Sequence, residues 1–583
     1  MISPVGARGL KDVNSLGAIA SLLALTVTLA GCGGGGSSSD PGPTPTPPGP
    51  PVTKADAYRF LDEATFGATE AQANQLMALG DATVAYATWI DQQMALPTST
   101  EYAYVQAAYQ AKSVTTGFNP GQVQVDRIDI WFQNAVNGPD QLRQRVAWAL
   151  SQTVVVSQVS LVNYPLGLAD YYDLLGRDAF GNFRQLLQDV TLHPMMGQYL
   201  NMRGNRKPND ALNIRPDENY ARELMQLFTI GLVQLNPDGT VQRDSQGVAV
   251  PTYDQSVVEG FAHLWTGWNW ACAGNSPANC AFSNTTATLA NQSLPMQAFA
   301  DQHDTGAKQL LSYAGAAKPS IPAGQTPELD LKDGLDNIFN HPNLGPFIAR
   351  QLIQKLVTSN PSAAYVQRIA QVFNNDGTGT RGNLAAVVKA ILLDTEARGA
   401  PTGAAIATAG KMKEPLARMT QFWRAYNGRA VSGKFVNFNP TAIFGQGPLQ
   451  SGSVFNFFSP FYAPPGEIAD QGLGAPELQI ATEYQNTVLT NAIWQQAFTR
   501  NSRSNVTDPN VIVINIDEEF ALAGDASALV SRVADKLLAG QISTTLQTEA
   551  MAAVNRIPAT SGAQRVAEAL WLIASSPDFA LQR

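Results

Sequence analysis

Residues 186–232 read LLQDVTLHPMMGQYLNMRGNRKPNDALNIRPDENYARELMQLFTIGL, and most of the unusual polar residues of the chain gather here between two apolar patterns. The part from Pro216 predicts a helix, because proline stands in the first turn, acidic residues follow it, and Gly231 comes after the last apolar position. Apolar side chains recur at spacings of three and four, at Tyr220, Leu224, Leu227 and Phe228. One face of this helix must therefore be buried in a core.

The opposite face of the same helix is polar. Glu218 and Arg222 are four residues apart, so their side chains lie on adjacent turns, and Asn219 with Glu223 forms a second such pair. These residues are either ion pairs on a solvated face or a cluster lining a cleft, with the loop 201–213 as its rim. In the second case Glu218, Arg222 and Glu223 are candidate catalytic residues for acid/base hydrolysis. Side chains five positions apart on a helix diverge by about 140°, which weakens the case for glycan hydrolysis.

Helical patterns continue along most of the chain, for example at 126–136, 141–156, 346–357 and 384–393. At 583 residues the chain is too long for one hydrophobic core, so we expect two or more lobes, at 53–400 and 401–583. Alternating residues around the turn NPDG predict a small β-hairpin near 233–252. The predicted fold is mainly α and multi-helical.

The first 52 residues differ in composition from the rest of the chain. Two basic residues precede an apolar run, 22–29, that is too short to span a membrane, and the run ends in Leu-Ala-Gly-Cys32. This pattern resembles bacterial lipoprotein precursors, which implies a signal peptide at 1–31 and a lipid on Cys32 that contacts the membrane. Residues 32–52 are rich in Gly, Ser and Pro and predict a tether. We therefore expect an exported protein of the bacterial cell envelope, at the outer membrane.

The other two cysteines, Cys272 and Cys280, stand at the ends of a short polar segment, CAGNSPANC. Two cysteines separated by such a loop in an exported chain predict a disulfide. A zinc site is not expected here, because no second Cys or His pair stands at ligand spacing.

The chain contains four histidines, of which His193 and His341 precede proline and His303 precedes Asp304. A histidine before proline is either a helix-start residue whose ring bonds to the backbone or a ligand in a site assembled from distant segments. In the second case a divalent metal has as its candidate ligands His193, His303, Asp304 and His341. The chain has no HExxH, GxSxG, CxxCH or P-loop motif, and its GxGxxG at 377–382 follows a helix. We therefore expect no nucleotide and no haem.

The segment SVFNFFSPFYAPPG at 453–466 is aromatic and rich in proline. It is either a clamp for sugar or peptide or a strap that packs two lobes together. The strap is our prediction.

Ten short segments carry a resemblance to a known family. They are RFLDEATFGAT (59–69), DQLRQRVAWALSQ (140–152), HPMMGQYLN (193–201), PDENYARELMQLFTIG (216–231), LWTGW (264–268), HDTGAK (303–308), HPNLGPFIARQLIQKLV (341–357), KEP (413–415), SVFNFF (453–458) and APELQI (475–480). In order and spacing they resemble a bacterial family called domain of unknown function 1800, over nearly all of residues 55–583. The resemblance implies no settled activity. Many members carry His at the position of Phe228, so a site built on that histidine is not expected here.

Members of that family are often encoded beside secreted proteins that resemble sulfatases and alkaline phosphatases, which implies an exported partner of that kind. A net charge of −9 and only 15% charged residues exclude nucleic acid as the main partner. We therefore expect a lipid-anchored scaffold or binding subunit for an exported partner or an extracellular substrate. The alternative is an envelope-anchored hydrolase with its polar centre around His193, Glu218–Glu223, His303–Asp304 and His341.

Overall fold

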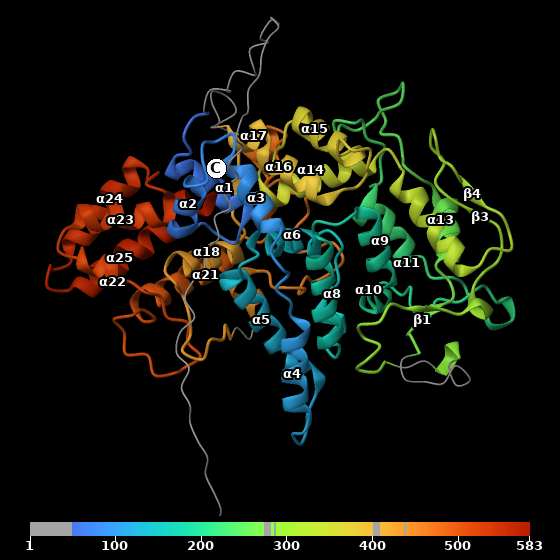
Figure 1. The fold of residues 1–583 in the computed structure, drawn as a ribbon, viewed down its shortest axis with the longest axis horizontal. Coiled ribbons are helices and arrows are strands. Elements are labelled where there is room, and N and C mark those ends of the chain that lie inside the picture. Colours follow the sequence, from blue (N-terminus) through green and yellow to red (C-terminus); the bar gives the residue numbers. More distant parts are fainter. Residues whose placement is uncertain (1–48, 273–280, 285–286, 400–407, 437–438, 583) are drawn as a thin grey trace, which may run out of the picture. The chain divides into compact units, whose positions relative to one another are not determined.

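The computed structural model describes residues 49–272, 281–284, 287–399, 408–436 and 439–582. Residue contacts group Gly49–Arg583 into one compact unit. In the described ranges, strands form only three antiparallel pairs, and helices make up most of the remaining regular structure (Figure 1). The predicted mainly α, multi-helical fold is confirmed.

Most helices begin at a Ser, Thr, Asn or Asp whose side chain accepts a hydrogen bond from the first turn, as Thr53, Asn182, Asp254 and Ser362 do. The helices before residue 272 are α1 (Lys54–Ala64), α2 (Glu70–Met77), α3 (Ala85–Met94), α4 (Tyr102–Ser113), α5 (Gln124–Asn137), α6 (Gln141–Ser151), α7 (Gln158–Leu161), α8 (Pro165–Asp178), α9 (Phe183–Leu192), α10 (Pro194–Tyr199), α11 (Asn219–Glu223) and α12 (Gln255–Leu264).

The later helices are α13 (Pro327–Phe339), α14 (Leu344–Leu356), α15 (Ala363–Asn374), α16 (Leu384–Leu393), α17 (Thr395–Arg398), α18 (Pro415–Ala425), α19 (Pro440–Phe444), α20 (Glu467–Asp470), α21 (Glu483–Phe498), α22 (Asp517–Ala521), α23 (Ala526–Leu538), α24 (Thr544–Arg556), α25 (Gly562–Ala574) and α26 (Pro577–Ala580). The strand pairs are β1 (Trp268–Asn269) with β2 (Gln297–Ala298), β3 (Lys308–Gln309) with β4 (Ser320–Ile321), and β5 (Lys411–Met412) with β6 (Leu581–Gln582).

The segment predicted as a hairpin, 233–252, contains two tight turns joined by isolated antiparallel bridges. Val233 pairs with Pro251, and Leu235 pairs with Val241 across the predicted NPDG turn. The chain therefore reverses where the sequence predicts it, but the pairing is too short and too interrupted to form continuous strands.

Helix α6 lies at the centre of the apolar core. All of its residues are buried, and it contacts α1, α3, α5, α8 and α14. The ring centroids of Trp131 from α5 and Trp148 from α6 are 5.1 Å apart. Full burial of an aromatic side chain of this size contributes about 2–3 kcal/mol relative to exposure. The core thus forms around helices from the first third of the chain, and α14 joins it from the middle.

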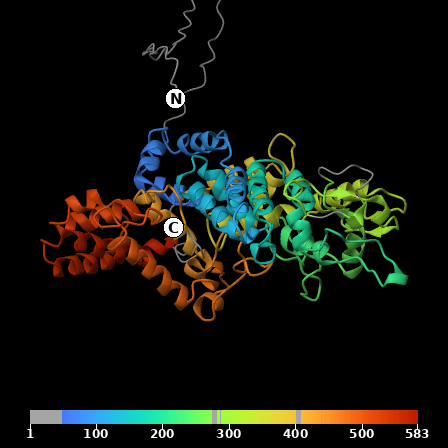
Figure 2. The same ribbon diagram turned by 90° about the horizontal axis from the view of Figure 1, so that it is seen from below.

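The end of the chain returns to this centre. In the β5–β6 pair, Lys411 lies opposite Gln582, and the Gln582 Nε2 atom donates a 2.7 Å hydrogen bond to the Leu356 carbonyl at the end of α14. Helices α23, α24 and α25 pack on one another just before this return, as both views show (Figure 1 and Figure 2). Segments from both predicted lobes therefore meet at one place.

Several predictions concern residues outside the described ranges. The signal peptide, Cys32, most of the tether, Cys280 and the lobe boundary at 400–401 all lie there. These predictions stay predictions. Among the described helices, none combines the length and the apolar character that crossing a membrane requires.

Candidate functional site

The candidate catalytic residues lie on the short helix α11 and directly before it, with Glu218 at its N-terminus and Arg222 and Glu223 at its end. The Arg222 Nη2 atom is 2.7 Å from Glu218 Oε2, which confirms the ion pair expected from the spacing. The side chains keep 41% and 34% of their surface exposed, so this pair contributes only about 0.3–0.5 kcal/mol. Gln255 from α12 donates a 2.9 Å hydrogen bond to the other Glu218 oxygen. This geometry fits the interpretation as a solvated helix face.

Glu223 has a different environment. Its Oε2 atom is buried and has no hydrogen-bond partner among the described residues. Burial raises the pKa of Glu223, and the charge of Arg222 opposes this only in part. A carboxyl group of this kind keeps its proton to a higher pH than an exposed one.

The π-helical turn η3 (Leu224–Thr229) follows α11 directly. The turn is wider than an α-helix because its hydrogen bonds join residues five apart, as between the Ile230 amide and the Met225 carbonyl at 3.0 Å. The Gly231 amide closes the turn by donating to the same carbonyl at 2.9 Å. Such turns are rare and occur frequently at functional sites. The side chains that this segment presents to one cavity are Gln226, Leu227 and Ile230.

His193 and His341 both bond to the backbone at helix starts. The Nδ1 atom of His193 accepts a 3.1 Å hydrogen bond from the Met195 amide in α10, and its Nε2 atom lies 3.1 Å from Asp170 Oδ2. The Nδ1 atom of His341 accepts a 3.1 Å hydrogen bond from the Asn343 amide, next to α14. Burial lowers the pKa of His341 to about 4. The helix-start interpretation of both residues is confirmed.

His303 and Asp304 bind different partners. The His303 Nδ1 atom donates to the Thr266 carbonyl at 2.9 Å, and Nε2 lies 3.0 Å from the buried Asp330 Oδ2. A hydrogen bond from His263 lowers the pKa of Asp304 to about 2. Within the described part of the chain, no three His, Cys, Asp or Glu residues are arranged to hold a metal ion. The structure therefore does not gather into one metal site the residues His193, His303, Asp304 and His341.

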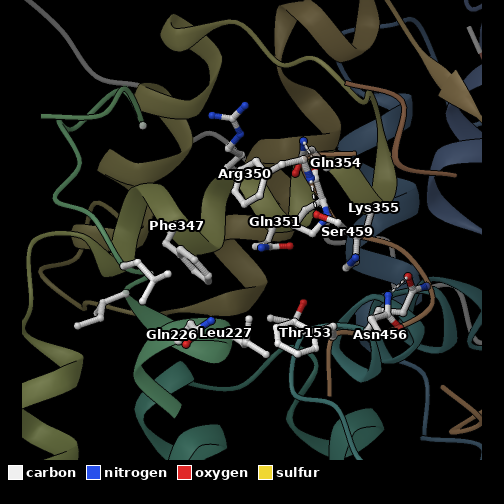
Figure 3. Close-up of a pocket in the computed structure, with 18 of the residues that line it drawn as sticks. Thr153, Gln226, Leu227, Phe347, Arg350, Gln351, Gln354, Lys355, Asn456 and Ser459 are labelled. Carbon is white, nitrogen blue, oxygen red and sulfur yellow. Dashed lines mark hydrogen bonds between the residues drawn. The ribbon is translucent and has the colours of Figure 1, made fainter. Parts of the chain in front are cut away.

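A cavity of about 390 Å³ lies between η3, α14 and the aromatic segment 453–466 (Figure 3). Its lining residues come from 152–153, 226–241, 347–355 and 454–461, and we call it the central pocket. Known small-molecule sites span roughly 300–1,000 Å³, so the size is suitable for a small ligand. The aromatic segment therefore lines a pocket as well as packing against the rest of the unit, which the strap prediction did not include.

The central pocket contains two cations, Lys355 and Arg350, and none of its described lining residues is a carboxylate. Neither cation forms a hydrogen bond or ion pair within the described residues. Each lies over a ring: Lys355 Nζ is 5.4 Å from the Phe458 centroid, and the Arg350 guanidinium is 5.6 Å from that of Phe461. Figure 3 shows Lys355 pointing into the space near Asn456, whereas the Arg350 guanidinium points away from it. Lys355 is thus the inner cation of the pocket.

Lys355 belongs to a group of charged residues, all buried except the partly buried Asp62. We call them the buried ion network: Asp62, Arg145, Lys355, Lys411, Lys413, Glu414 and Glu477. Lys411 Nζ lies 2.8 Å from Glu477 Oε1, and Lys413 Nζ lies 2.8 Å from Asp62 Oδ2. The Arg145 Nη1 atom lies 3.8 Å from Glu414 Oε1. These pairs use all three carboxylates and three of the four cations, and they leave Lys355 without a counter-ion.

The environment of Lys355 disfavours its charge. Burial lowers the pKa of Lys355 to about 8; Glu414 opposes the shift, and Lys411 adds to it. The ammonium is still mostly protonated at neutral pH. The central pocket therefore holds an unpaired positive charge at physiological pH.

Hydrogen bonds join the pocket wall to the buried ion network. Gln354 Nε2 donates to the Pro460 carbonyl at 3.1 Å, while its buried Oε1 atom has no partner among the described residues. Asn456, held at a φ of 67°, donates to Gln152 at 3.2 Å, and Gln152 donates to Glu414 at 3.0 Å. The aromatic segment, α6, α14 and the buried carboxylate thus form one connected structure.

Residues 59–581 match the model of a family described as Protein of unknown function (DUF1800). The chain belongs to this family. No curated protein and no solved structure matches the chain at a significant level. Seven of the ten segments that carry the family resemblance contribute residues to the central pocket or the buried ion network: 59–69, 140–152, 216–231, 341–357, 413–415, 453–458 and 475–480. Most of the segments that mark the family therefore meet at the central pocket or at the buried ion network next to it.

Sequence reasoning did not identify the central pocket. One signal was available in α14, where Arg350, Gln351, Gln354 and Lys355 place polar groups on one side of an otherwise apolar helix. Polar residues repeated at this spacing in a buried helix indicate a cavity or a polar partner.

Proposed function

We propose that the chain is an exported, lipid-anchored envelope protein that acts as a binding subunit, with the central pocket as the site for an extracellular substrate. The pocket itself carries this proposal. It is lined mainly by apolar side chains, and a few polar groups converge on it, which is the usual composition of small-molecule sites. Export and outer-membrane anchoring rest on the sequence around Cys32 and on the tether. A Cys272–Cys280 disulfide fits the same oxidising compartment.

Exposed aromatic side chains at the central pocket support a second protein as a partner. Phe455 and Phe461 line the pocket and keep 58% and 66% of their surface exposed. Exposed aromatic residues at a rim favour protein–protein contact. The partner we propose is an exported protein of the sulfatase-like or phosphatase-like kind.

Filling the central pocket tests the binding function. Leu227→Trp places a larger ring at the pocket wall, whereas Leu212→Trp changes a residue that is 68% exposed. Native mass spectrometry of protein purified from the cell envelope is expected to show a bound small molecule in the wild type and in Leu212→Trp but not in Leu227→Trp. Equal loading of the two variants, or an unloaded wild type, contradicts the proposal.

Anchoring is tested separately by fractionation. Cys32→Ala removes the residue expected to carry lipid, and it is expected to move the protein from the membrane fraction to the soluble exported fraction. Unchanged membrane association of this variant contradicts lipid anchoring and leaves the pocket proposal untouched.

A second candidate function is hydrolysis. Glu223 supports it, because its buried Oε2 atom has no hydrogen-bond partner among the described residues and burial raises its pKa. In that case Glu223→Gln abolishes hydrolysis of chromogenic ester and glycoside substrates, while Glu218→Gln retains it. Equal activity of the two variants, or no turnover by the wild type, counts against the hydrolase.

A further inference from the structure

The charges around the central pocket do not balance. Three ion pairs use every carboxylate of the buried ion network, and Lys355 has no ion pair of its own among the described residues. Only the longer-range attraction of Glu414 and Glu477 and the ring of Phe458 favour its charge. A buried charge without a partner costs several kcal/mol, and proteins normally pair such groups. An anion in the central pocket would supply the missing counter-ion.

Because Lys355 lies at the inner end of the cavity, we expect the anion to bind there. Its ammonium points into the pocket, and Gln351 from the same helix also faces the space (Figure 3). The Gln351 amide makes no hydrogen bond within the described residues, so it is free to donate to an anionic oxygen. A cation and an amide one turn apart suit the two oxygens of a carboxylate.

Most of the remaining lining of the central pocket is apolar, and its further polar side chains are Gln152, Thr153, Gln226, Gln354, Asn456 and Ser459. Leu227 and Ile230 come from η3 and the residue after it, Phe347 from α14, and Val454 and Phe458 from the aromatic segment. These side chains offer few hydrogen bonds to the hydroxyl groups of a sugar. They suit a hydrocarbon or aromatic body.

We infer that the central pocket binds a carboxylate-bearing amphiphile, with the carboxylate on Lys355 and the apolar body between η3, α14 and the aromatic segment. This inference rests on the proposed binding function and specifies the class of its substrate. Arg350, which lies over Phe461 and points away from the cavity, attracts the anion on approach rather than holding it.

Isothermal titration of the purified full-length chain with octanoate, octanamide and octylamine at pH 7 tests the inference. Octanoate is expected to bind at least tenfold more tightly than octanamide, because a charge-assisted hydrogen bond contributes about tenfold to a hundredfold in affinity. Lys355→Met is expected to remove that difference. Lys332→Met, which changes a lysine with 64% of its side chain exposed, is expected to keep it.

The outcomes separate the two proposals. Equal binding of all three probes to the wild type overturns the anionic ligand and leaves the pocket as a binding site. Binding of octanoate that Lys355→Met does not weaken overturns the role of Lys355. Absence of binding by every probe, together with an unloaded native protein, contradicts the binding function itself.

A measurement on the wild type covers the case in which Lys355→Met does not fold. Octanoate affinity is expected to fall as the pH rises above about 8, where Lys355 loses its proton, while octanamide affinity stays constant. The charged groups around Lys355 are Arg145, Arg350, Lys411, Glu414 and Glu477. A pH-independent preference for octanoate overturns the inference.

Discussion

Lys355 illustrates how one residue can be costly to the fold and useful to a site. Its backbone carbonyl accepts hydrogen bonds from Arg145 at 2.8 Å and Lys411 at 3.0 Å, so the main chain at this position is fixed. The side chain has no counter-ion within the described residues. A fixed, unpaired cation is preorganised for an anionic ligand, because the free-energy cost of burying and ordering it already belongs to the folded state.

Lys355→Met is expected to stabilise the protein in the absence of ligand. Methionine fills a similar volume without a charge, and replacing buried charges by apolar residues often stabilises a protein, here on the order of 1 kcal/mol. In the wild type, the pKa of Lys355 falls from 10.5 to about 8 on folding, so wild-type stability rises with pH between these values. The advantage of the variant is therefore largest below pH 8 and shrinks toward pH 10.5. Urea unfolding at several pH values measures this; an advantage that grows with pH contradicts the account.

At the scale of elements, the sequence predicted the helix after Pro216 but not its π-helical turn. The apolar spacing of Tyr220, Leu224 and Leu227 fits an α-helix, whereas the widening depends on backbone hydrogen bonds between residues five apart, such as Ile230 to Met225. A change in the backbone hydrogen bonds leaves no mark in the apolar pattern. The role of the turn at the central pocket is therefore visible only in the structure.

Gly231 closes this turn at the rim of the central pocket. Its φ is +75°, and a Cβ atom added here would lie 3.3 Å from the Phe347 ring. Gly247 has a φ of +82°, with nothing within 4 Å of an added Cβ. Gly231→Ala and Gly247→Ala are each expected to cost about 1–2 kcal/mol through backbone strain. Only Gly231→Ala is expected to displace Phe347 and weaken octanoate binding.

Calorimetry and titration of both glycine variants check this prediction. Gly247→Ala is the control, because it introduces similar backbone strain but no contact of the added Cβ atom with Phe347. Octanoate binding that is the same in both variants would show that the end of η3 does not shape the pocket.

Other elements show why sequence patterns reveal some helices and hide others. Helix α4 was not predicted because Val105 is its only buried residue, so it lacks an apolar stripe. Helix α8 was missed for the opposite reason: it is buried on most sides and contains Gly167 and Gly176. Helices α14 and α16, by contrast, were predicted within two residues of their observed bounds, at 346–357 and 384–393.

At the scale of the whole molecule, the mainly α class could be predicted, because it follows from repeated spacings of three and four. The central pocket could not be derived in the same way. Its walls and the buried ion network come from segments that extend from Asp62 to Glu477, and their meeting depends on long-range packing. A His-Pro pair looks the same in the sequence of a helix start and of a ligand site, so the sequence did not distinguish between these two interpretations of the histidines.

The last residues of the chain pack against β5 and the end of α14. We therefore predict that the compact unit unfolds in one step. Phe579 is fully buried in α26, and Lys413 from the buried ion network lies over its ring at 5.0 Å. Phe579→Ala is expected to cost about 3–5 kcal/mol, whereas Phe520→Ala, at a residue that is 37% exposed, is expected to cost much less.

Differential scanning calorimetry of both phenylalanine variants is expected to show a single transition that Phe579→Ala lowers as a whole. Two transitions, of which only one shifts, would show instead that 53–400 and 401–583 unfold as independent lobes.

The most direct test of the central pocket as the functional site is hydrogen–deuterium exchange of the full-length chain with and without saturating octanoate. Slower exchange is expected in 224–231, 344–356 and 453–461, with no change in α23–α25. Protection around His193, Glu218–Glu223, His303 and His341, or no protection in the three pocket segments, would contradict the account.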